Sequence, residues 1–373
     1  MDERNDPNLL FWFYLADNKK NLRKKLLSPE TGPYLFFRRN KTGVQALLAE
    51  YMAHDQVPQV FLHGSPHIDN YAKTEQGYGM IDFDRAYIGP YLWDLACVLL
   101  AIALRNPETY RQPLSAKIKE TFIGTYEDAL QHPDRPYLPY QPLELITPKR
   151  WEIDPDLYLE DKHKWAKQLH EAKLPEKDPI ADALFQGYRL HLEDKALLTG
   201  YHVKQRARAA GSFGRKRYLF LLTHADKTPC LLDMKETKNY LNWDWPHLAY
   251  YHSPFQHEGE RMRHAAKIYA PGLAKGESYA TVNGIQYWGR TIPFLNRKPA
   301  KCFSLDDQIS FAYSAASQLA RGHALAVHQT DPDRLLAHLH TQWATLNKQI
   351  EAIKTALFAV WEQCCVPSVK VKK

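Results

Sequence analysis

Apolar residues at helical spacing predict helices over much of this chain. Between residues 41 and 53, Val44, Leu47, Leu48 and Tyr51 fall on one face of a helix. The same spacing predicts further helices at residues 94–104, 114–130, about 157–172, 257–269 and 304–328. The first 32 residues have the pattern of a polar helical arm, and residues 34–39 are a short apolar run that ends in two arginines.

Two features mark the helices of the C-terminal quarter. Ser304, with Asp307 three residues later, resembles a capping box and predicts a helix start. After Pro332, apolar residues recur in alternating steps of three and four, at Leu336, Leu339, Trp343, Leu346, Ile350, Ile353, Leu357 and Val360. We favour a long helix packed on its own domain over a coiled coil that binds a partner.

Strand patterns fall in two parts of the chain. Residues 57–62 predict a short strand that leads into a polar loop, and Asp82 and Asp84 end the next strand. A composition shift near Tyr201 begins a strand-rich part, with strands expected at 218–222, 230–234, 279–282 and 285–288. Asn283-Gly284 between the last two is a strong signal for a two-residue hairpin turn.

Composition indicates an ordinary folded protein. The length of 373 residues favours two domains or lobes, and 45% hydrophobic with 24% charged residues argues against bulk disorder. The net charge of +7 permits a nucleotide ligand, but the basic residues are dispersed and no recognition motif accompanies them, so we expect no nucleic-acid partner. Five cysteines without Cys-x-x-Cys spacing indicate reduced, packed thiols. No signal peptide or membrane span is apparent, and we expect a cytoplasmic protein.

The candidate chemistry is densest between Phe61 and Leu95. Asn70 in the loop and Asp82 at the strand end are hard oxygen ligands of the kind that Mg²⁺ prefers. This pair predicts a magnesium site that serves phosphoryl or nucleotidyl transfer. The alternative is that Asn70 caps a turn and Asp82 begins the turn toward Gly89-Pro90.

Two histidines of the same loop admit a second interpretation. His63 and His67, with Asp69 beside them, are possible zinc ligands. Two loop histidines without cysteine or a helical His-x-x-x-His frame make a poor zinc site. We therefore expect hydrogen bonds from these rings to shape the loop.

A second group of candidates lies later in the chain. Gly211-Ser212-Phe213-Gly214 precedes a predicted strand, where the backbone N–H groups of such a turn can face phosphates. An ordinary hairpin is the alternative. Lys235 closes the next strand, within reach of phosphates bound under the turn, and Glu260 on the following helix offers it an ion-pair partner.

These motifs resemble a known group of proteins. HGSPHIDN followed by MIDFDRAYIGPYLWDLA looks like the loop and strand motifs of the aminoglycoside-phosphotransferase-like branch of the protein-kinase fold. Residues 34–328 more closely resemble an uncharacterised bacterial kinase-like family, domain of unknown function twenty-two fifty-two. The resemblance rests on the order of seven motifs, which here read YLFFRR, HGSPHIDN, IDFDRA, GSFG, MKET, GERM and LARGHA.

The resemblance implies roles for the candidate residues. Asn70 and Asp82 would bind Mg²⁺, and Asp94 would hold the catalytic loop from the start of the next helix. For the nucleotide site, Gly211–Gly214 would be the loop that covers the phosphates, and Lys235 would contact the α- and β-phosphates. Glu260 would be the partner of that lysine. Residues 289–293, with Arg290, would be the hinge that faces the adenine.

The resemblance also implies an α+β, two-lobed protein-kinase-like fold. The catalytic motifs precede the glycine loop and lysine, so the fold would be circularly permuted. We expect an N-terminal arm at residues 1–33, the first part of the helical lobe at 34–130 and a connecting segment at 131–200. The strand-rich nucleotide lobe would follow at 201–298, and C-terminal helices at 299–373 would complete the helical lobe.

Ser65 departs from the motif. The corresponding aspartate would accept or orient the acceptor hydroxyl, and general-base catalysis contributes roughly 10²- to 10⁴-fold. Phosphoryl transfer depends more on positioning and charge neutralisation, so a slow reaction could survive. Asp69 or Asp84 could replace the base, the protein could bind nucleotide without turnover, or it could transfer AMP. The candidate catalytic residues are Ser65, His67, Asp69 and Asp84.

The leading prediction is therefore an ATP- and Mg²⁺-dependent phosphotransferase that acts on a small molecule or a protein hydroxyl. A pseudokinase that binds nucleotide or a partner is the alternative from another class. A third possibility is a binding module that works through the C-terminal helix. The acceptor and the oligomeric state cannot be read from these residues.

Overall fold

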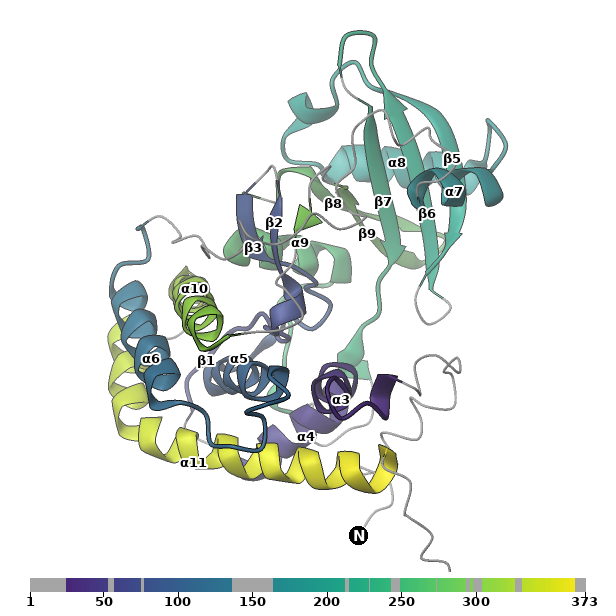
Figure 1. The fold of residues 1–373 in the computed structure, drawn as a ribbon. Coiled ribbons are helices and arrows are strands. Elements are labelled where there is room, and N and C mark those ends of the chain that lie inside the picture. The colour runs from purple at the N-terminus through teal and green to yellow at the C-terminus, as the bar shows by residue number, and fades with distance from the viewer. Residues whose placement is uncertain are drawn as a thin grey trace, which may run out of the picture.

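The computed structural model describes residues 25–52, 57–74, 77–135, 164–211, 215–227, 229–242, 249–272, 274–292, 296–297, 304–325 and 331–365. Within these ranges a helical half and a strand-rich half lie one above the other (Figure 1). Most of the predicted N-terminal arm, and residues 212–214 of the predicted glycine turn, lie outside the described residues.

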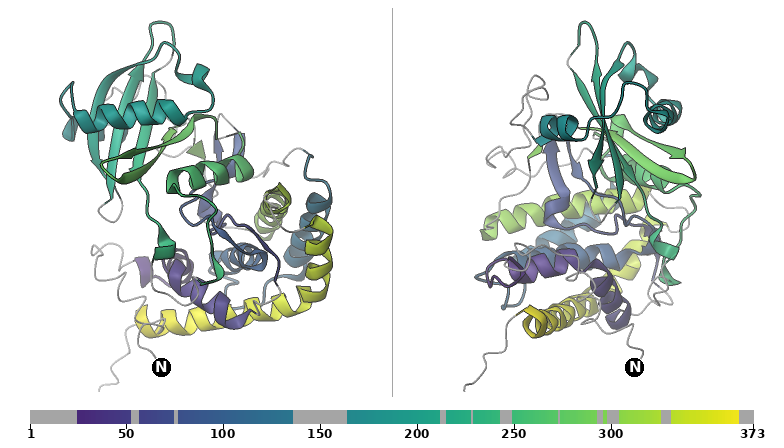
Figure 2. Two further views of the ribbon diagram at one scale, coloured as in Figure 1. Left: turned by 180° about the vertical axis from the view of Figure 1, so that it is seen from behind. Right: turned by 90° about the vertical axis from the view of Figure 1, so that its right-hand side faces the viewer.

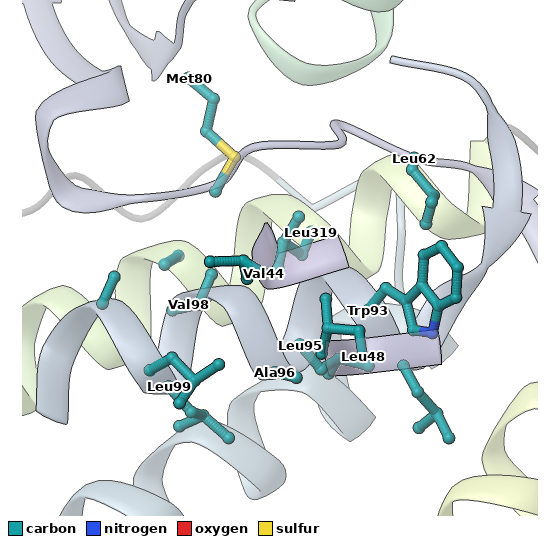
Figure 3. Close-up of a cluster of buried hydrophobic side chains, with 14 of the residues drawn as sticks. Val44, Leu48, Leu62, Met80, Trp93, Leu95, Ala96, Val98, Leu99 and Leu319 are labelled. Atoms are coloured by element: carbon teal, nitrogen blue, oxygen red, sulfur yellow. The ribbon is translucent and has the colours of Figure 1, made fainter. Parts of the chain in front are cut away.

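The helical half is built around one apolar helix. Its helices are α3 (Gly32–Arg39), α4 (Lys41–Tyr51), α5 (Tyr91–Arg105), α6 (Ala116–Gln131), α10 (Leu305–Leu325) and α11 (Pro332–Cys365). Helix α5 is the innermost, because almost every residue from Tyr91 to Leu104 is buried. Figure 3 shows its Trp93, Leu95 and Leu99 among the apolar side chains of neighbouring segments. A helix that is apolar all round is the expected centre of a core.

Helix α11 packs on its own chain, as we favoured. It contacts α3, α4, α5 and α6 and runs beneath them in Figure 1. Most of the predicted seam is buried or partly buried in this contact, including Leu339, Leu346 and Ile350. The predicted capping box of α10 is also present, since Ser304 N donates to Asp307 Oδ2 at 3.2 Å and Asp307 N donates to Ser304 Oγ at 3.1 Å.

The strand-rich half is an antiparallel five-stranded sheet. Its strands are β5 (His202–Ala210), β6 (Lys216–Thr223), β7 (Cys230–Glu236), β8 (Glu277–Val282) and β9 (Ile285–Thr291), in the spatial order β5-β6-β7-β9-β8. The predicted hairpin turn is confirmed, because Asn283 and Gly284 have φ values of 51° and 73°. The sequence did not single out β5, which is an edge strand of the sheet. The residues after α7 pair with its outer edge, since Leu174 N donates to Arg206 O at 2.9 Å and Arg208 N donates to Ala172 O at 2.9 Å.

A helix covers each face of this sheet. Helix α8 (Pro179–His191) packs on the face that carries Tyr218, Phe220 and Leu222 of β6, and α7 (Lys164–Glu171) packs on the opposite face with Leu219 and Leu221. Figure 2 shows α8 crossing the strands. The alternation follows from the two-residue period of a strand. The predicted piece at 157–172 corresponds to α7, whereas α8 lies in a part that we expected only to connect.

Short strands and α9 join the two halves. Strands β1 (Gln59–Phe61) and β4 (Ile88–Pro90) pair with each other, and β2 (Tyr71–Thr74) pairs with both β3 (Gly77–Met80) and β10 (Asn296–Arg297). Helix α9 (Glu258–Tyr269) contacts β8, β9, β3 and α10. The described 3₁₀ turns are η2 (Ile68–Asn70), η5 (Lys195–Leu198), η7 (Tyr240–Asn242) and η9 (Ala274–Gly276). Among the described helices, none is long and apolar enough to cross a membrane.

Candidate functional site

Asp94 holds the loop that follows β1. Its Oδ2 accepts a hydrogen bond from His63 N at 2.7 Å, and its Oδ1 accepts one from Gly64 N at 2.9 Å. Asp94 is buried in the first turn of α5, so the innermost helix of the helical half fixes the loop backbone. This contact is the one that the motif resemblance implied for Asp94.

Two side chains from later helices support Asp94. His323 Nε2 of α10 lies 3.4 Å from Asp94 Oδ2, and His323 Nδ1 lies 2.7 Å from the hydroxyl of Tyr126 on α6. His323 is fully buried. We did not assign this histidine a role from the sequence, although LARGHA, the motif that contains it, was among those that carried the resemblance.

Asn70 and Asp82 come together at the base of the β2–β3 hairpin. Tyr71 pairs with Met80 in the hairpin, and Ile81 N donates to Asn70 O at 2.8 Å. Asn70 Nδ2 donates to Ser65 O at 3.1 Å, which leaves its side-chain oxygen for another partner. Asp82 is exposed, with a φ of 73°. An amide oxygen and an exposed carboxylate at the base of one hairpin are the kinds of oxygen ligand that Mg²⁺ prefers.

Gly64 brings the two loops into contact. Its φ of +76° lies in the left-handed region, and a Cβ built there would be 1.7 Å from Arg85 O. Only glycine fits without a shift of the backbone. The loop that carries Ser65 therefore packs directly on the segment that follows Asp82.

Arg261 of α9 holds the same segment from the other half. It is 1% exposed and donates to three backbone oxygens, those of Phe83 at 3.3 Å, Asp84 at 3.1 Å and Ala86. Its guanidinium also pairs with Glu258 at 2.7 Å. Sequence reasoning missed Arg261, which only its place in the GERM motif could have indicated.

Lys235 reaches the segment as well, through Asp84. Lys235 Nζ lies 3.1 Å from Asp84 Oδ2, and Arg215 Nη1 lies 2.9 Å from the same oxygen. Burial raises the pKa of the Asp84 carboxyl, but the charges of Lys235 and Arg215 outweigh it and hold that pKa well below its usual range. The ion pairs thus join the sheet to the segment that carries Asp82.

The partner that we predicted for Lys235 is different in the structure. Among the described residues, no ion pair joins Lys235 to Glu260, whose charge acts instead on Tyr279. In the first turn of α9, Glu258 is the buried glutamate, and it pairs with Arg261. The orientation of α9 about its axis therefore buries Glu258 and not Glu260, and Asp84 is the carboxylate beside Lys235.

The remaining acidic and imidazole candidates of the loop have structural contacts. Asp69 is ion-paired with Arg38 of α3. The His63 ring packs edge-on against Phe83 and Tyr269, and burial lowers its pKa to about 4. The described part of the chain contains no cluster of three His, Cys, Asp or Glu side chains that could hold a metal ion.

Ser65 lines a small cavity with cations beside it. The serine is 2% exposed, and its N–H donates to His63 Nδ1 at 3.2 Å. His67, Arg38 and Lys41 line the same cavity, against apolar side chains of α4 and α5. Burial lowers the pKa of Lys41, and the charge of Asp82 opposes that shift. No sequence motif pointed to Lys41.

The other nucleotide-site candidates lie in the sheet. A Cβ on Gly211 would be 2.3 Å from Arg215 O, so the chain is tight where the predicted glycine turn begins. Arg290 of β9 pairs in register with Asp233, a carboxylate held by Arg217 at 2.6 Å. The roles of Gly211 and Arg290 toward a nucleotide stay predictions.

Comparison with known proteins agrees with this geometry. The family model described as phosphotransferase enzyme family (APH) matches residues 1–138, which include the loop, the hairpin and all of α6. The region of the site is thus similar to a phosphotransferase family, which supports a phosphotransferase in general terms. The family model described as uncharacterized protein conserved in bacteria (DUF2252) matches residues 146–362. That match covers more than half of the chain, which therefore belongs to this family. No curated protein and no solved structure matched the chain.

Proposed function

We propose that the chain is an ATP- and Mg²⁺-dependent phosphotransferase with a kinase-like active site between its two halves. The observation that carries the proposal is the ion pair of Lys235 with Asp84 at 3.1 Å. It brings a sheet lysine beside the segment of Asp82, where a nucleotide phosphate and its metal ion have to meet. Asn70 and Asp82 would hold Mg²⁺ through oxygen atoms, and the metal would neutralise charge on the transferred phosphoryl group.

The arrangement of the sheet supports this assignment. In protein kinases, a glycine-rich loop covers the phosphates, the lysine lies on the third strand, and a helix glutamate pairs with it. Here Lys235 lies on the third strand of the sheet, and α9 follows that strand. Because these elements come after the loop of Ser65 in the chain, we propose a circularly permuted kinase-like fold in which α7 and α8 belong to the nucleotide lobe together with the sheet.

Ser65 favours a second candidate function. The serine offers no carboxylate, while Asp69 and Asp84 are both ion-paired with cations. A pseudokinase that binds nucleotide without transfer is consistent with those contacts. Transfer of AMP is the third candidate function for the same residues, and it would require a part of ATP other than the γ-phosphate to lie over the loop.

One experiment separates these functions. The protein is incubated with Mg²⁺ and ATP labelled at either the α- or the γ-phosphate, and nucleotide binding, phosphate release and label transfer are measured. We expect transfer from γ-labelled ATP and a loss of at least tenfold in Asp82→Ala and Lys235→Met. Binding without transfer selects the pseudokinase, and transfer of the α-label alone selects AMP transfer. Undiminished binding and transfer in Asp82→Ala would refute the metal site.

A further inference from the structure

The cavity beside Ser65 contains a cation that the proposed function does not use. Lys41 begins α4 and lines this cavity together with Ser65 and His67. Its ammonium forms no hydrogen bond or ion pair with any other described residue. The carboxylate that acts on it most strongly is Asp82, one of the two proposed magnesium ligands.

The other cations near the site are already paired. Arg38 is paired with Asp69, and Lys235 and Arg215 share Asp84. Once a divalent cation binds Asp82, that carboxylate no longer balances Lys41. A largely buried cation is costly unless an anion pairs with it. The metal-loaded site therefore favours an anion beside Lys41.

Ser65 allows an anion to approach. A carboxylate at position 65 would repel a negatively charged group that enters the cavity, whereas a neutral serine does not. The cavity is small, about 20 Å³, which is room for roughly one water-sized group, so it takes a single oxygen of an anionic group and not a whole molecule. Val44 and Trp93 are among its apolar walls, and Arg38, Gln45 and Asp94 also line it. Both carboxylate oxygens of Asp94 already accept backbone hydrogen bonds, from His63 N and Gly64 N.

We infer that the acceptor binds beside Ser65 through an anionic oxygen of a carboxylate or phosphate group, and that Lys41 holds this oxygen. The inference follows from the positive charge of Lys41 and the neutral side chain of Ser65. This inference rests on the proposed phosphotransferase function and names its acceptor class. The anionic oxygen attacks the γ-phosphorus of ATP and forms a new P–O bond. The bond from that phosphorus to the β,γ-bridging oxygen breaks, and ADP leaves with the electron pair. No proton has to be removed from the acceptor, so no carboxylate base is needed.

Calorimetric titration of the full chain tests the subsite. Acetate and inorganic phosphate are the probes, glycerol is the neutral comparison, and each is titrated with and without saturating Mg²⁺ and ADP. We expect at least one anion, and not glycerol, to bind saturably to the ADP-loaded protein. Lys41→Met and Ser65→Asp should each weaken that binding at least tenfold, the first by removing the cation and the second by adding a repelling charge.

Lys117→Met provides the matched control, because Lys117 is an exposed lysine on α6. It should leave anion binding unchanged within twofold. Thermal unfolding of each variant shows whether it is folded. If Lys41→Met does not fold, Ser65→Asp still tests the inference. Absence of anion binding, or equal binding in wild type and both site variants, would overturn the inference.

A further arm separates the two sources of an anion. ADP is replaced by the β,γ-imido analogue of ATP, which carries its own γ-phosphate. If the analogue displaces both probes, and Lys41→Met weakens the analogue tenfold but ADP less than twofold, the anion is that γ-phosphate and the acceptor inference is wrong. Failure of the proposed function would appear separately, as ADP binding that needs neither Mg²⁺ nor Asp82.

Discussion

Lys235 Nζ lies 3.1 Å from Asp84 Oδ2, although 151 positions separate the two residues in the chain. The contact predicts that Asp84, and not Glu260, positions the lysine for a nucleotide. We expect Asp84→Asn to weaken Mg²⁺-ADP binding at least tenfold and Glu260→Gln to change it less than twofold. Equilibrium titration with a fluorescent nucleotide measures both. A larger loss of nucleotide affinity in Glu260→Gln than in Asp84→Asn would support the Lys235–Glu260 ion pair that the sequence indicated.

The buried guanidinium of Arg261 should contribute strongly to stability. Removal of one partner from a buried ion pair typically costs about 3–5 kcal/mol, and Arg261→Met also leaves the carbonyls of Phe83 and Asp84 without their donor. Arg111→Met removes an exposed ion pair with Glu362 and should cost no more than about 1 kcal/mol. Urea unfolding compares the two variants. Equal losses would contradict the tight contact of α9 with the segment after Asp82.

Gly64 and Gly124 form a matched pair for substitution by alanine. At Gly64 the positive φ and the carbonyl of Arg85 leave no room for a Cβ, so Gly64→Ala should destabilise by more than about 1 kcal/mol. At Gly124 in α6 a Cβ meets nothing within 4 Å, so Gly124→Ala should stabilise the helix by about 0.5–1 kcal/mol. Thermal unfolding midpoints give both values. A neutral Gly64→Ala would show that the two site loops are not in close contact.

Glu277 should make stability depend on pH. It is 5% exposed and accepts a hydrogen bond from Trp288 Nε1 at 2.9 Å, and burial raises its pKa from 4.5 to about 8. Between these values the folded protein holds a proton that the unfolded chain releases. Stability from this group is therefore present below pH 4.5 and decreases as the pH rises through 8, by an amount on the order of a few kcal/mol.

Glu277→Gln tests this expectation, since the amide does not titrate. The difference in unfolding free energy between pH 6 and pH 9, measured with urea, should shrink in the variant. Glu193→Gln is the comparison, because Glu193 pairs with Lys267 at the surface and should leave that difference almost unchanged. An unchanged pH dependence in Glu277→Gln would mean that the carboxyl is ionised in the fold.

Local patterns in the sequence predicted local structure well. The Asn283-Gly284 turn and the Ser304 box each depend on a few neighbouring residues, and both are present. Asn70 and Asp82 were predicted as a pair, and only a short hairpin separates them. A fold that brings them together therefore needs no long-range information.

The parts of the site that depend on distant contacts were harder to predict. Glu258 and Glu260 share the first turn of α9, and only the packing of the helix decides which of them turns inward. Lys41 lines the cavity because residues of α4 and α5 enclose it from two sides, and periodicity cannot specify how two helices are placed. Residues that act across the fold become recognisable only once the fold is known.

The chain of Tyr126, His323 and Asp94 has a consequence for the order of folding. The loop of Ser65 belongs to the first quarter of the sequence, yet the imidazole that supports its aspartate lies 229 positions further on. Contacts between such distant residues form late, because a long loop must close first. During synthesis, the loop therefore emerges long before α10 can dock against it. A nascent chain that lacks α10 carries every residue of the loop and Asp94, but not the imidazole that supports Asp94.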